Sequence, residues 1–161
     1  MSVETEAYDM KKILFVCHGN ICRSPMAEFV FRDLVEKRGL SHRIAAASAA
    51  TSTEEIGNPV HPGTRRKLQE HGIGCAGKTA RQLTRRDYEE YDLLIGMDEY
   101  NMRNMRRMLG GDPDGKLVKL LCFCGETRDV ADPWYTGDFE QTWQDVLRGC
   151  TALLDELIAD K

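Results

Sequence analysis

The chain has 161 residues, 42% of them hydrophobic and 30% charged, and a net charge of −4. This length suits one domain with a single core, and the slight acidity gives no basic surface of the kind that binds nucleic acid. No apolar run approaches the roughly 20 residues of a membrane span. From the charge and the lack of such a run, we expect neither a nucleic-acid partner nor a membrane partner.

The first eleven residues are predicted to form a disordered tail, and residues 12–161 are predicted to form the domain. The tail is acidic and lacks the apolar stretch of a signal peptide, so we expect a cytoplasmic protein with reduced cysteines. The cysteine spacing matches no zinc pattern, and we expect no metal and no cofactor. Four cysteines are expected to be small buried apolar residues: Cys75, Cys122, Cys124 and Cys150.

Short apolar runs alternate with helical patterns along the chain. Strands are predicted at residues 12–16, 43–48, 93–97 and 117–121. Strands separated by helices favour a parallel arrangement, because a parallel connection needs a crossover helix. The sequence therefore predicts a single-domain α/β fold, with a four-stranded parallel twisted sheet and helices on both faces.

Three helical segments carry clear signals. The first has Ser24 as a candidate N-cap, Pro25 at the first helical position and Gly39 just past its end. The last follows Asp138 and carries one long apolar stripe. Between them, methionines recur at residues 97–108; Met102 and Met105 share a face, which predicts core packing.

The segment V-C-H-G-N-I-C-R-S-P-M-A-E, residues 16–28, joins the first strand to the first helix. An open α/β sheet binds ligands at this position, and a helix N-terminus offers unpaired N–H groups to an anion. Gly19 and Asn20 tolerate the positive φ that lets N–H groups converge, and the Arg23 guanidinium can hold two oxygens of a tetrahedral oxyanion. The positive field also favours the thiolate of Cys17. The segment predicts a nucleophile inside a phosphate pocket.

The same segment resembles the signature of the low-molecular-weight protein tyrosine phosphatases. The likeness continues over almost the whole chain after residue 11, including Asp132-Pro133-Trp134-Tyr135, which is similar to the family's Asp-Pro-aromatic loop. It implies a flavodoxin- or Rossmann-like fold (the phosphotyrosine phosphatase I fold) and metal-independent hydrolysis of phosphotyrosine monoesters. A phosphotyrosine-containing protein is the implied partner, and a monomer is expected.

The resemblance implies a role for each part of the site. Cys17 would attack phosphorus, Arg23 would hold the equatorial oxygens, and Asp132 would protonate the leaving phenolate. The implied phosphate-binding loop comprises His18, Gly19, Asn20, Ile21, Cys22, Arg23 and Ser24.

Other residues are implied to support the reaction. Ser24 would hydrogen-bond the Cys17 sulfur, and Asn20, Ser48 and His71 would hold the loop in shape. His71 has a second interpretation, as a residue that ends its helix. The pocket wall would consist of Ile21, Trp134 and Tyr135.

Cys22 is the implied redox partner of Cys17. A disulfide between them would protect Cys17 from irreversible oxidation, and reversible inactivation by peroxide is expected.

Several alternatives compete with this interpretation. Residues 72–79 match G-x-x-x-x-G-K-[ST], but a helical pattern precedes them where a nucleotide-binding motif needs a strand. An arsenate reductase would use a similar loop but needs relay cysteines, which residues 97–108 lack. A protein-arginine phosphatase tends to carry Thr in place of Ile21, whose apolar side chain suits an aromatic ring. A phosphocysteine carrier would need no leaving-group acid.

Two positions and one segment depart from the family pattern. His18 replaces an apolar residue, and its role is left open between solvent and the pocket rim. Ala50 replaces a glycine, which would cost stability if the backbone there needed positive φ. The segment 51–58 lacks the aromatic residue that often flanks the pocket.

Overall fold

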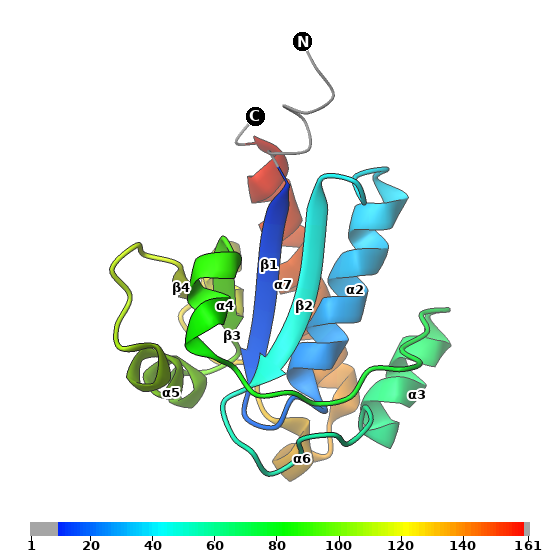
Figure 1. Cartoon of the computed structure of the whole chain (residues 1–161). Coiled ribbons are helices and arrows are strands. Elements are labelled where there is room, and N and C mark those ends of the chain that lie inside the picture. Colours follow the sequence, from blue (N-terminus) through cyan, green and yellow to red (C-terminus); the bar gives the residue numbers. More distant parts are fainter. Residues whose placement is uncertain (1–9, 160–161) are drawn as a thin grey trace.

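A four-stranded parallel sheet forms the centre of the computed structural model, which describes residues 10–159. The strands are β1 (Lys11–Cys17), β2 (Ile44–Ala50), β3 (Leu93–Gly96) and β4 (Leu117–Lys119). Their spatial order is β2-β1-β3-β4, with every neighbouring pair parallel (Figure 1). The predicted fold class is confirmed. Of the expected tail, residues 1–9 lie outside the described residues, and Lys11 belongs to β1.

Alternating side chains of β1 supply two separate cores. Ile13, Phe15 and Cys17 point to one face of the sheet, and Leu14 and Val16 point to the other. Because successive side chains of a strand face opposite ways, a strand buried on both faces is continuously apolar. The run Ile13–Val16 is fully buried for this reason.

Helices cover both faces (Figure 1). The first face packs against α2 (Arg23–Lys37), α3 (Pro62–Glu70) and α7 (Phe139–Ala159), and the second against α4 (Arg85–Glu90) and α5 (Glu99–Leu109). Two short helices complete the fold: the 3₁₀ helix η1 (Leu120–Cys124) and α6 (Pro133–Thr136). Among the described residues, no helix is long and apolar enough to cross a membrane.

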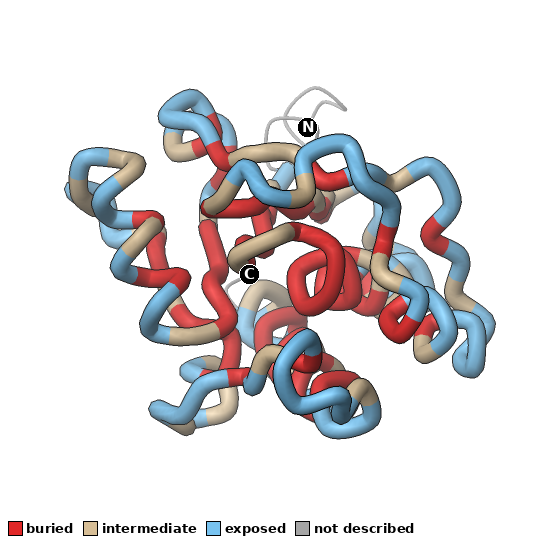
Figure 2. Tube along the Cα trace, turned by 90° about the horizontal axis from the view of Figure 1, so that it is seen from below, coloured by how far each residue is buried: buried red, intermediate tan, exposed pale blue. Residues whose placement is uncertain are grey.

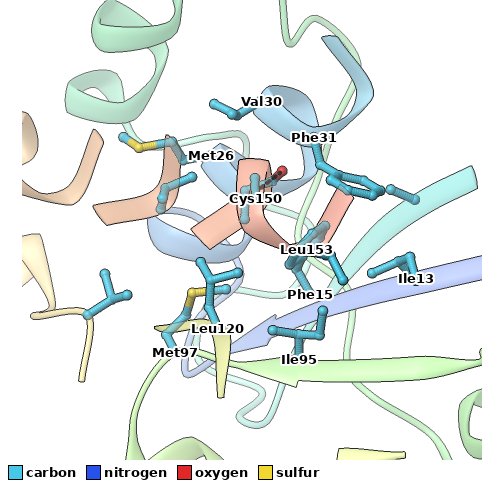
Figure 3. Close-up of a cluster of buried hydrophobic side chains, with 14 of the residues drawn as sticks. Ile13, Phe15, Met26, Val30, Phe31, Ile95, Met97, Leu120, Cys150 and Leu153 are labelled. Atoms are coloured by element: carbon cyan, nitrogen blue, oxygen red, sulfur yellow. Dashed lines mark hydrogen bonds between the residues drawn. The ribbon is translucent and has the colours of Figure 1, made fainter. Parts of the chain in front are cut away.

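The larger core lies between the sheet, α2 and α7 (Figure 3). The rings of Phe15 and Phe31 meet edge to face with centroids 5.6 Å apart. Burying one such side chain contributes about 1.5–3 kcal/mol. Gly149 lets α7 approach η1 closely, since a Cβ there would lie 2.4 Å from Cγ of Leu120. These contacts hold α2, and therefore its N-terminus, firmly against the sheet.

The carboxyl ends of the four parallel strands meet at one edge of the sheet. Figure 2 looks toward this end and shows buried chain at the centre with exposed loops around it. The loop after β1 lies here, as do the segments that follow β2, β3 and β4. Parallel topology therefore brings together residues that are distant in sequence.

Several local predictions need correction. Ser24 is not an N-cap: α2 already begins at Arg23, and its N-cap is Cys22. The predicted fourth strand stops at Lys119, and the apolar residues after it form η1. Cys75 and Cys150 are buried as expected, but Cys122 is exposed. A short apolar run does not distinguish a strand from a buried helical turn.

Two other predictions are confirmed. Met102 and Met105 are buried in the second core, on α5. The nucleotide-binding match at residues 72–79 follows helix α3 and is followed by no helix until α4. Gly72 has a φ of 74° just beyond the helix, which explains the glycine without a nucleotide.

Candidate active site

The backbone between β1 and α2 turns its carbonyl groups away from the centre of the loop. The carbonyls of Cys17 and His18 accept from the N–H groups of Thr51 and Ser52, each at 3.0 Å. Those of Ile21 and Cys22 accept from His61 N at 2.9 Å and from Thr64 Oγ1 at 3.1 Å. In a trans peptide the next N–H points opposite to the carbonyl, so these N–H groups converge inside the loop. Converging N–H groups at a helix N-terminus form a nest, an arrangement that suits an anion.

Asn20 adopts the unfavourable backbone conformation of this turn. Its φ of 59° is left-handed, and among the described residues it alone has a positive φ without being glycine. Gly19 does not share this conformation; instead, a Cβ at Gly19 would lie 3.3 Å from Cγ of Glu55. The Asn20 side chain compensates, because Oδ1 accepts from Arg81 N at 3.1 Å and Nδ2 donates twice.

A buried chain of hydrogen bonds leads to the Cys17 sulfur. Asn20 Nδ2 donates to Ser24 Oγ at 2.8 Å and to Ser48 Oγ at 2.9 Å. Ser24 Oγ lies 3.0 Å from Cys17 Sγ, and Ser24 N donates to the same sulfur at 3.4 Å. Since Ser24 already accepts from Asn20, its own hydrogen is free to point at the sulfur. The hydroxyl of Ser24 can therefore donate a hydrogen bond to the Cys17 sulfur.

At its other end, this chain of hydrogen bonds reaches a buried acid, Glu28, which the sequence analysis did not predict. Ser48 Oγ donates to Glu28 Oε1 at 2.6 Å, and Glu28 is 3% exposed. Lys78 Nζ lies 3.8 Å from the same oxygen and donates to Ser48 O at 3.0 Å. Burial lowers the pKa of Lys78, although the nearby Glu28 raises it in part. Glu28 follows Ser24 by one helical turn, and this spacing was the available signal.

Arg23 is almost fully buried and fixed by three groups from two segments. Its Nη1 donates to Asp98 Oδ2 at 2.7 Å and to Val130 O at 2.8 Å, and its Nη2 lies 3.4 Å from Asp132 Oδ2. Burial alone would lower the pKa of Arg23, but the negative charges of Cys17, Asp98 and Asp132 raise it. The guanidinium therefore stays charged beside the thiol.

One polar atom of Arg23 has no partner among the described residues. Nε is buried and makes no hydrogen bond. An unsatisfied buried donor costs about 1–3 kcal/mol, so a group that accepts from Nε is favoured there. An oxyanion above Cys17 would be such a group.

Asp132 lies at the N-terminus of α6. Its Oδ1 accepts from Trp134 N at 3.0 Å as the N-cap, which leaves Oδ2 facing Arg23. The side chain is 23% exposed, so it meets both the buried guanidinium and solvent. A carboxyl group in this place can exchange a proton with a ligand in the pocket.

A cleft of about 500 Å³ contains these groups. Its lining comprises Cys17, His18, Gly19, Ile21, Cys22, Arg23, Glu54, Glu55, Asp132, Trp134 and Tyr135. The structure thus brings together the predicted nucleophile, arginine, acid and pocket wall. Trp134 and Tyr135 are 57% and 83% exposed, and large exposed aromatics beside a cleft suit contact with a ring.

His18 lies on the rim of this cleft. Its Nε2 is 3.2 Å from Glu54 Oε2, and its ring centroid is 6.0 Å from that of Tyr100. The segment 51–58, which lacks the expected aromatic residue, instead places Glu54 and Glu55 at the cleft. Neither acid was predicted from the sequence.

The structure decides two points that the sequence leaves open. His71 does not contribute to the loop network: it is the C-cap of α3, and its ring stacks on Trp143 with centroids 3.8 Å apart. Lys78, from the following segment, reaches Ser48 and Glu28 instead. Ala50 is an extended β2 residue paired with Cys17 and does not need positive φ. Its alanine therefore carries no backbone strain.

Cys22 is 5% exposed and lies in the same loop as Cys17. Burial, followed by the charges of Cys17 and Asp132, raises the pKa of Cys22 to about 12. Cys22 is therefore a neutral thiol when Cys17 is a thiolate. Both cysteines are free.

The fold and this site define a class: an α/β protein with a buried cysteine in a loop between a strand and a helix N-terminus, beside a buried arginine. The family model of low molecular weight phosphotyrosine protein phosphatases matches residues 12–161. The chain therefore belongs to this family.

Individual relatives agree with the family model. The low molecular weight protein-tyrosine-phosphatase YfkJ of Bacillus subtilis is 43% identical over 94% of this chain and 99% of its own length. Its crystal structure gives a TM-score of 0.91, covering 94% of this chain and 97% of that one. The phosphatase SP-PTP of Streptococcus pyogenes is 42% identical with a TM-score of 0.83, covering 92% and 93%. The arginine phosphatase DARP of drosophila is 28% identical with a TM-score of 0.83, covering 93% and 99%.

Proposed function

We propose that this protein is a protein-tyrosine phosphatase that hydrolyses phosphotyrosine monoesters through a phosphocysteine intermediate. The observation that carries the proposal is the shared cleft in which the Cys17 thiol, the unpartnered Nε of Arg23 and the Asp132 carboxyl group meet. The family and its relatives, named as protein-tyrosine phosphatases, support the same activity.

The first step transfers the phosphoryl group to sulfur. The Cys17 thiolate attacks phosphorus, an S–P bond forms, and the bond between phosphorus and the phenolic oxygen breaks. Asp132 donates its proton to that oxygen, so tyrosine leaves neutral rather than as a phenolate. Arg23 and the inward N–H groups hold the three equatorial oxygens as negative charge redistributes over them.

The second step releases phosphate. Asp132, now a carboxylate, accepts a proton from a water that attacks phosphorus, and the S–P bond breaks. The electron pair returns to Cys17, where the Ser24 hydroxyl stabilises the departing thiolate at 3.0 Å. Positive charge in both steps comes from Arg23 and the helix N-terminus, so the proposed reaction is metal-independent.

Preference for phosphotyrosine follows from the walls of the cleft. Ile21, Trp134 and Tyr135 offer apolar and aromatic surface to the phenyl ring. A phosphoarginine side chain is flexible and cationic beyond the phosphoryl group and gains less from that surface. The arginine phosphatase from drosophila makes the comparison with phosphoarginine a necessary part of the test.

Redox control is a further part of the proposal. Peroxide would convert the Cys17 thiolate to a sulfenic acid, and the Cys22 thiol would displace water from it to form a disulfide. A thiol reductant would restore both cysteines. After peroxide and then reductant, wild type should recover most of its own initial activity, and Cys22→Ser should not. Equal recovery in the two proteins would contradict this role of Cys22.

The test of the main proposal uses a tyrosine phosphopeptide with EDTA present. Rapid quenching followed by peptide mass spectrometry should find one phosphoryl group on the peptide that contains Cys17. A matched phosphoarginine peptide should be hydrolysed more slowly, and arsenate with thioredoxin should not be reduced. No phosphorylated Cys17 peptide, dependence on added metal, or faster turnover of either alternative would overturn the proposal.

A further inference from the structure

A buried lysine lies outside the cleft and has no part in the proposed chemistry. Lys119 is the last residue of β4, so it lies at the edge of the sheet where the active site is built. It is 7% exposed. A lysine this deeply buried is costly unless its charge is compensated.

Lys119 contacts two segments at once. Its Nζ donates to Thr127 O at 2.6 Å and to Asp129 Oδ1 at 2.9 Å, and it lies 2.9 Å from Glu99 Oε2. Burial alone would lower the pKa of Lys119, but Asp129 and Glu99 outweigh it and raise the pKa. Lys119 is therefore a charged link between the first turn of α5 and the segment 126–132, which we call the acid loop because it ends at Asp132.

The acid loop has no helix or strand of its own. Lys119 is one of several groups that hold this loop. Val130 N donates to Met97 O at 2.9 Å, Arg128 forms two hydrogen bonds to the buried Asp145, at 2.7 and 3.2 Å, and Asp129 Oδ1 accepts from Glu99 N at 3.2 Å. Lys119 adds the ionic contacts, since its Nζ lies 2.9 Å from the carboxylates of both Asp129 and Glu99.

Both segments joined by Lys119 lead directly to Arg23. Asp98, next to Glu99, pairs with Nη1 of Arg23, and the carbonyl of Val130, next to Asp129, accepts from the same nitrogen. The third contact is with Asp132 itself, at 3.4 Å. Displacement of either segment would therefore change the position of the acid relative to the arginine.

We propose that Lys119 is a positioning residue that fixes the acid loop, and with it Asp132, against Arg23. This inference rests on the proposed role of Asp132 as the leaving-group acid. A lysine needed only for folding would affect all substrates alike. One that positions the acid matters more when the leaving group is more basic, since a basic leaving group needs the proton more.

The experiment measures kcat/KM for phenyl phosphate and for 2,4-dinitrophenyl phosphate, whose leaving group is far more acidic. Lys119→Met should lower kcat/KM about ten-fold for phenyl phosphate and less than about two-fold for the dinitrophenyl ester. Lys119→Arg keeps the charge and should restore most of the loss. Lys67→Met is the matched control, since Lys67 pairs with Glu70 and Glu140 away from the cleft. It should behave as wild type.

Asp129→Asn gives a second route if Lys119→Met does not fold. It weakens the loop side of the link and leaves Lys119 with Glu99 and Thr127 O. The same selective loss is expected. Equal losses on both substrates, or no loss, would overturn the positioning role.

Asp132→Ala in the same series separates the two hypotheses. A steep dependence on the leaving group in this variant, combined with none in the Lys119 and Asp129 variants, would overturn the inference alone. A flat loss in Asp132→Ala would overturn the acid assignment, and the inference with it.

Discussion

The two sides of the cleft are built in contrasting ways. On the thiol side, Cys17, Asn20 and Ser24 are buried and their polar groups bond to one another. On the acid side, Asp132 is partly exposed, and Trp134 and Tyr135 stand in solvent on a helix of four residues. The side proposed to meet the phosphoryl group is thus held by its own hydrogen bonds, and the side proposed to meet the rest of the substrate is open to protein surfaces of different shapes.

The two sides also differ in the surroundings of a lysine that is half-buried on the thiol side and buried on the acid side. Lys78 faces one carboxylate at 3.8 Å and a backbone carbonyl, and its pKa is lowered. Lys119 faces two carboxylates at 2.9 Å, and its pKa is raised. The thiol side keeps an incompletely compensated positive charge near Cys17, where it favours an anion. On the acid side, two carboxylates compensate the charge of Lys119, which joins the segments that carry them.

The largest effect is expected from removal of the nucleophile. Cys17→Ser should lower kcat by at least about 10⁴-fold, because a hydroxyl at neutral pH is a far weaker nucleophile than a thiolate. The rigid loop should remain intact and still bind inorganic phosphate, measured by calorimetry. Cys75→Ser, in a separate cleft, is the control and should keep wild-type activity. Substantial turnover in Cys17→Ser would refute the role of the thiol side.

Changes at Asp132 test the acid side. Asp132→Ala and Asp132→Asn should both lower kcat/KM for a tyrosine phosphopeptide by about 10²–10⁴-fold, since neither carries a transferable proton. The pair differs in structure: the amide oxygen of asparagine can still accept from Trp134 N and cap α6, whereas alanine cannot. If only the alanine variant loses activity, Asp132 acts through the cap and not through its proton.

Asn20 tests how much of the thiol side depends on backbone strain. Asn20→Gly removes three hydrogen bonds but accepts the φ of 59°, and should lower the free energy of unfolding by about 2–4 kcal/mol. Asn20→Ala should cost about 1–2 kcal/mol more, since a Cβ disfavours the left-handed region. Denaturant unfolding measures both. Equal stability of the two variants would show that strain at Asn20 is negligible.

The smallest expected effect is a difference between Lys78 and Lys119 in how they make the stability depend on pH. The pKa of Lys78 in the folded protein lies below its ordinary value of 10.5. Between these two pKa values, the unfolded chain binds more protons than the folded protein. Lys78 therefore makes stability rise with pH in that range. Lys119 has a raised pKa, so its contribution is constant below 10.5 and falls only above it. From about pH 8 to about pH 10, the stability of wild type relative to Lys78→Met should therefore increase.

Relative to Lys119→Met, the stability of wild type should stay level over that range. Chemical unfolding at each pH gives both comparisons. Parallel curves for the two variants would show that the two lysines do not differ in this way.

Much of the fold could be predicted because its information is local. Continuous apolar runs such as Ile13–Val16 indicated strands buried on both faces, and the helix after the first strand followed from its spacing. The end of β4 could not be predicted, since Leu120 and Leu121 continue the apolar run and only their packing against α7 turns them into η1. The Ser-Pro pair is typical of an N-cap, but the Ser24 hydroxyl bonds to Cys17 and Asn20 instead.

The sequence indicated the residues that line the cleft better than those that support them. Cys17, Arg23 and Asp132 belong to motifs, and the structure brings them into one cleft. No pattern in the sequence assigns a role to the four supporting charged residues, because each reaches the site through a contact with a residue 10 to 75 positions away: Glu28, Lys78, Asp98 and Lys119. Of the two interpretations of His71, the structure shows the one in which it ends its helix, and Lys78, seven residues later, makes the contacts to Ser48 and Glu28. Side-chain direction after a helix end depends on packing, which sequence spacing does not specify.

The chain contains two tryptophans, Trp134 and Trp143, and the fold gives them opposite surroundings. Trp143 is 6% exposed and stacked on His71, whereas Trp134 stands at the mouth of the cleft. Indole emission depends on solvent contact, so the protein carries its own optical reporter of occupancy beside a constant internal reference. Removing Trp143 would leave a single emitter at the cleft, and stopped-flow fluorescence would then follow each arrival and departure of a ligand without any attached dye.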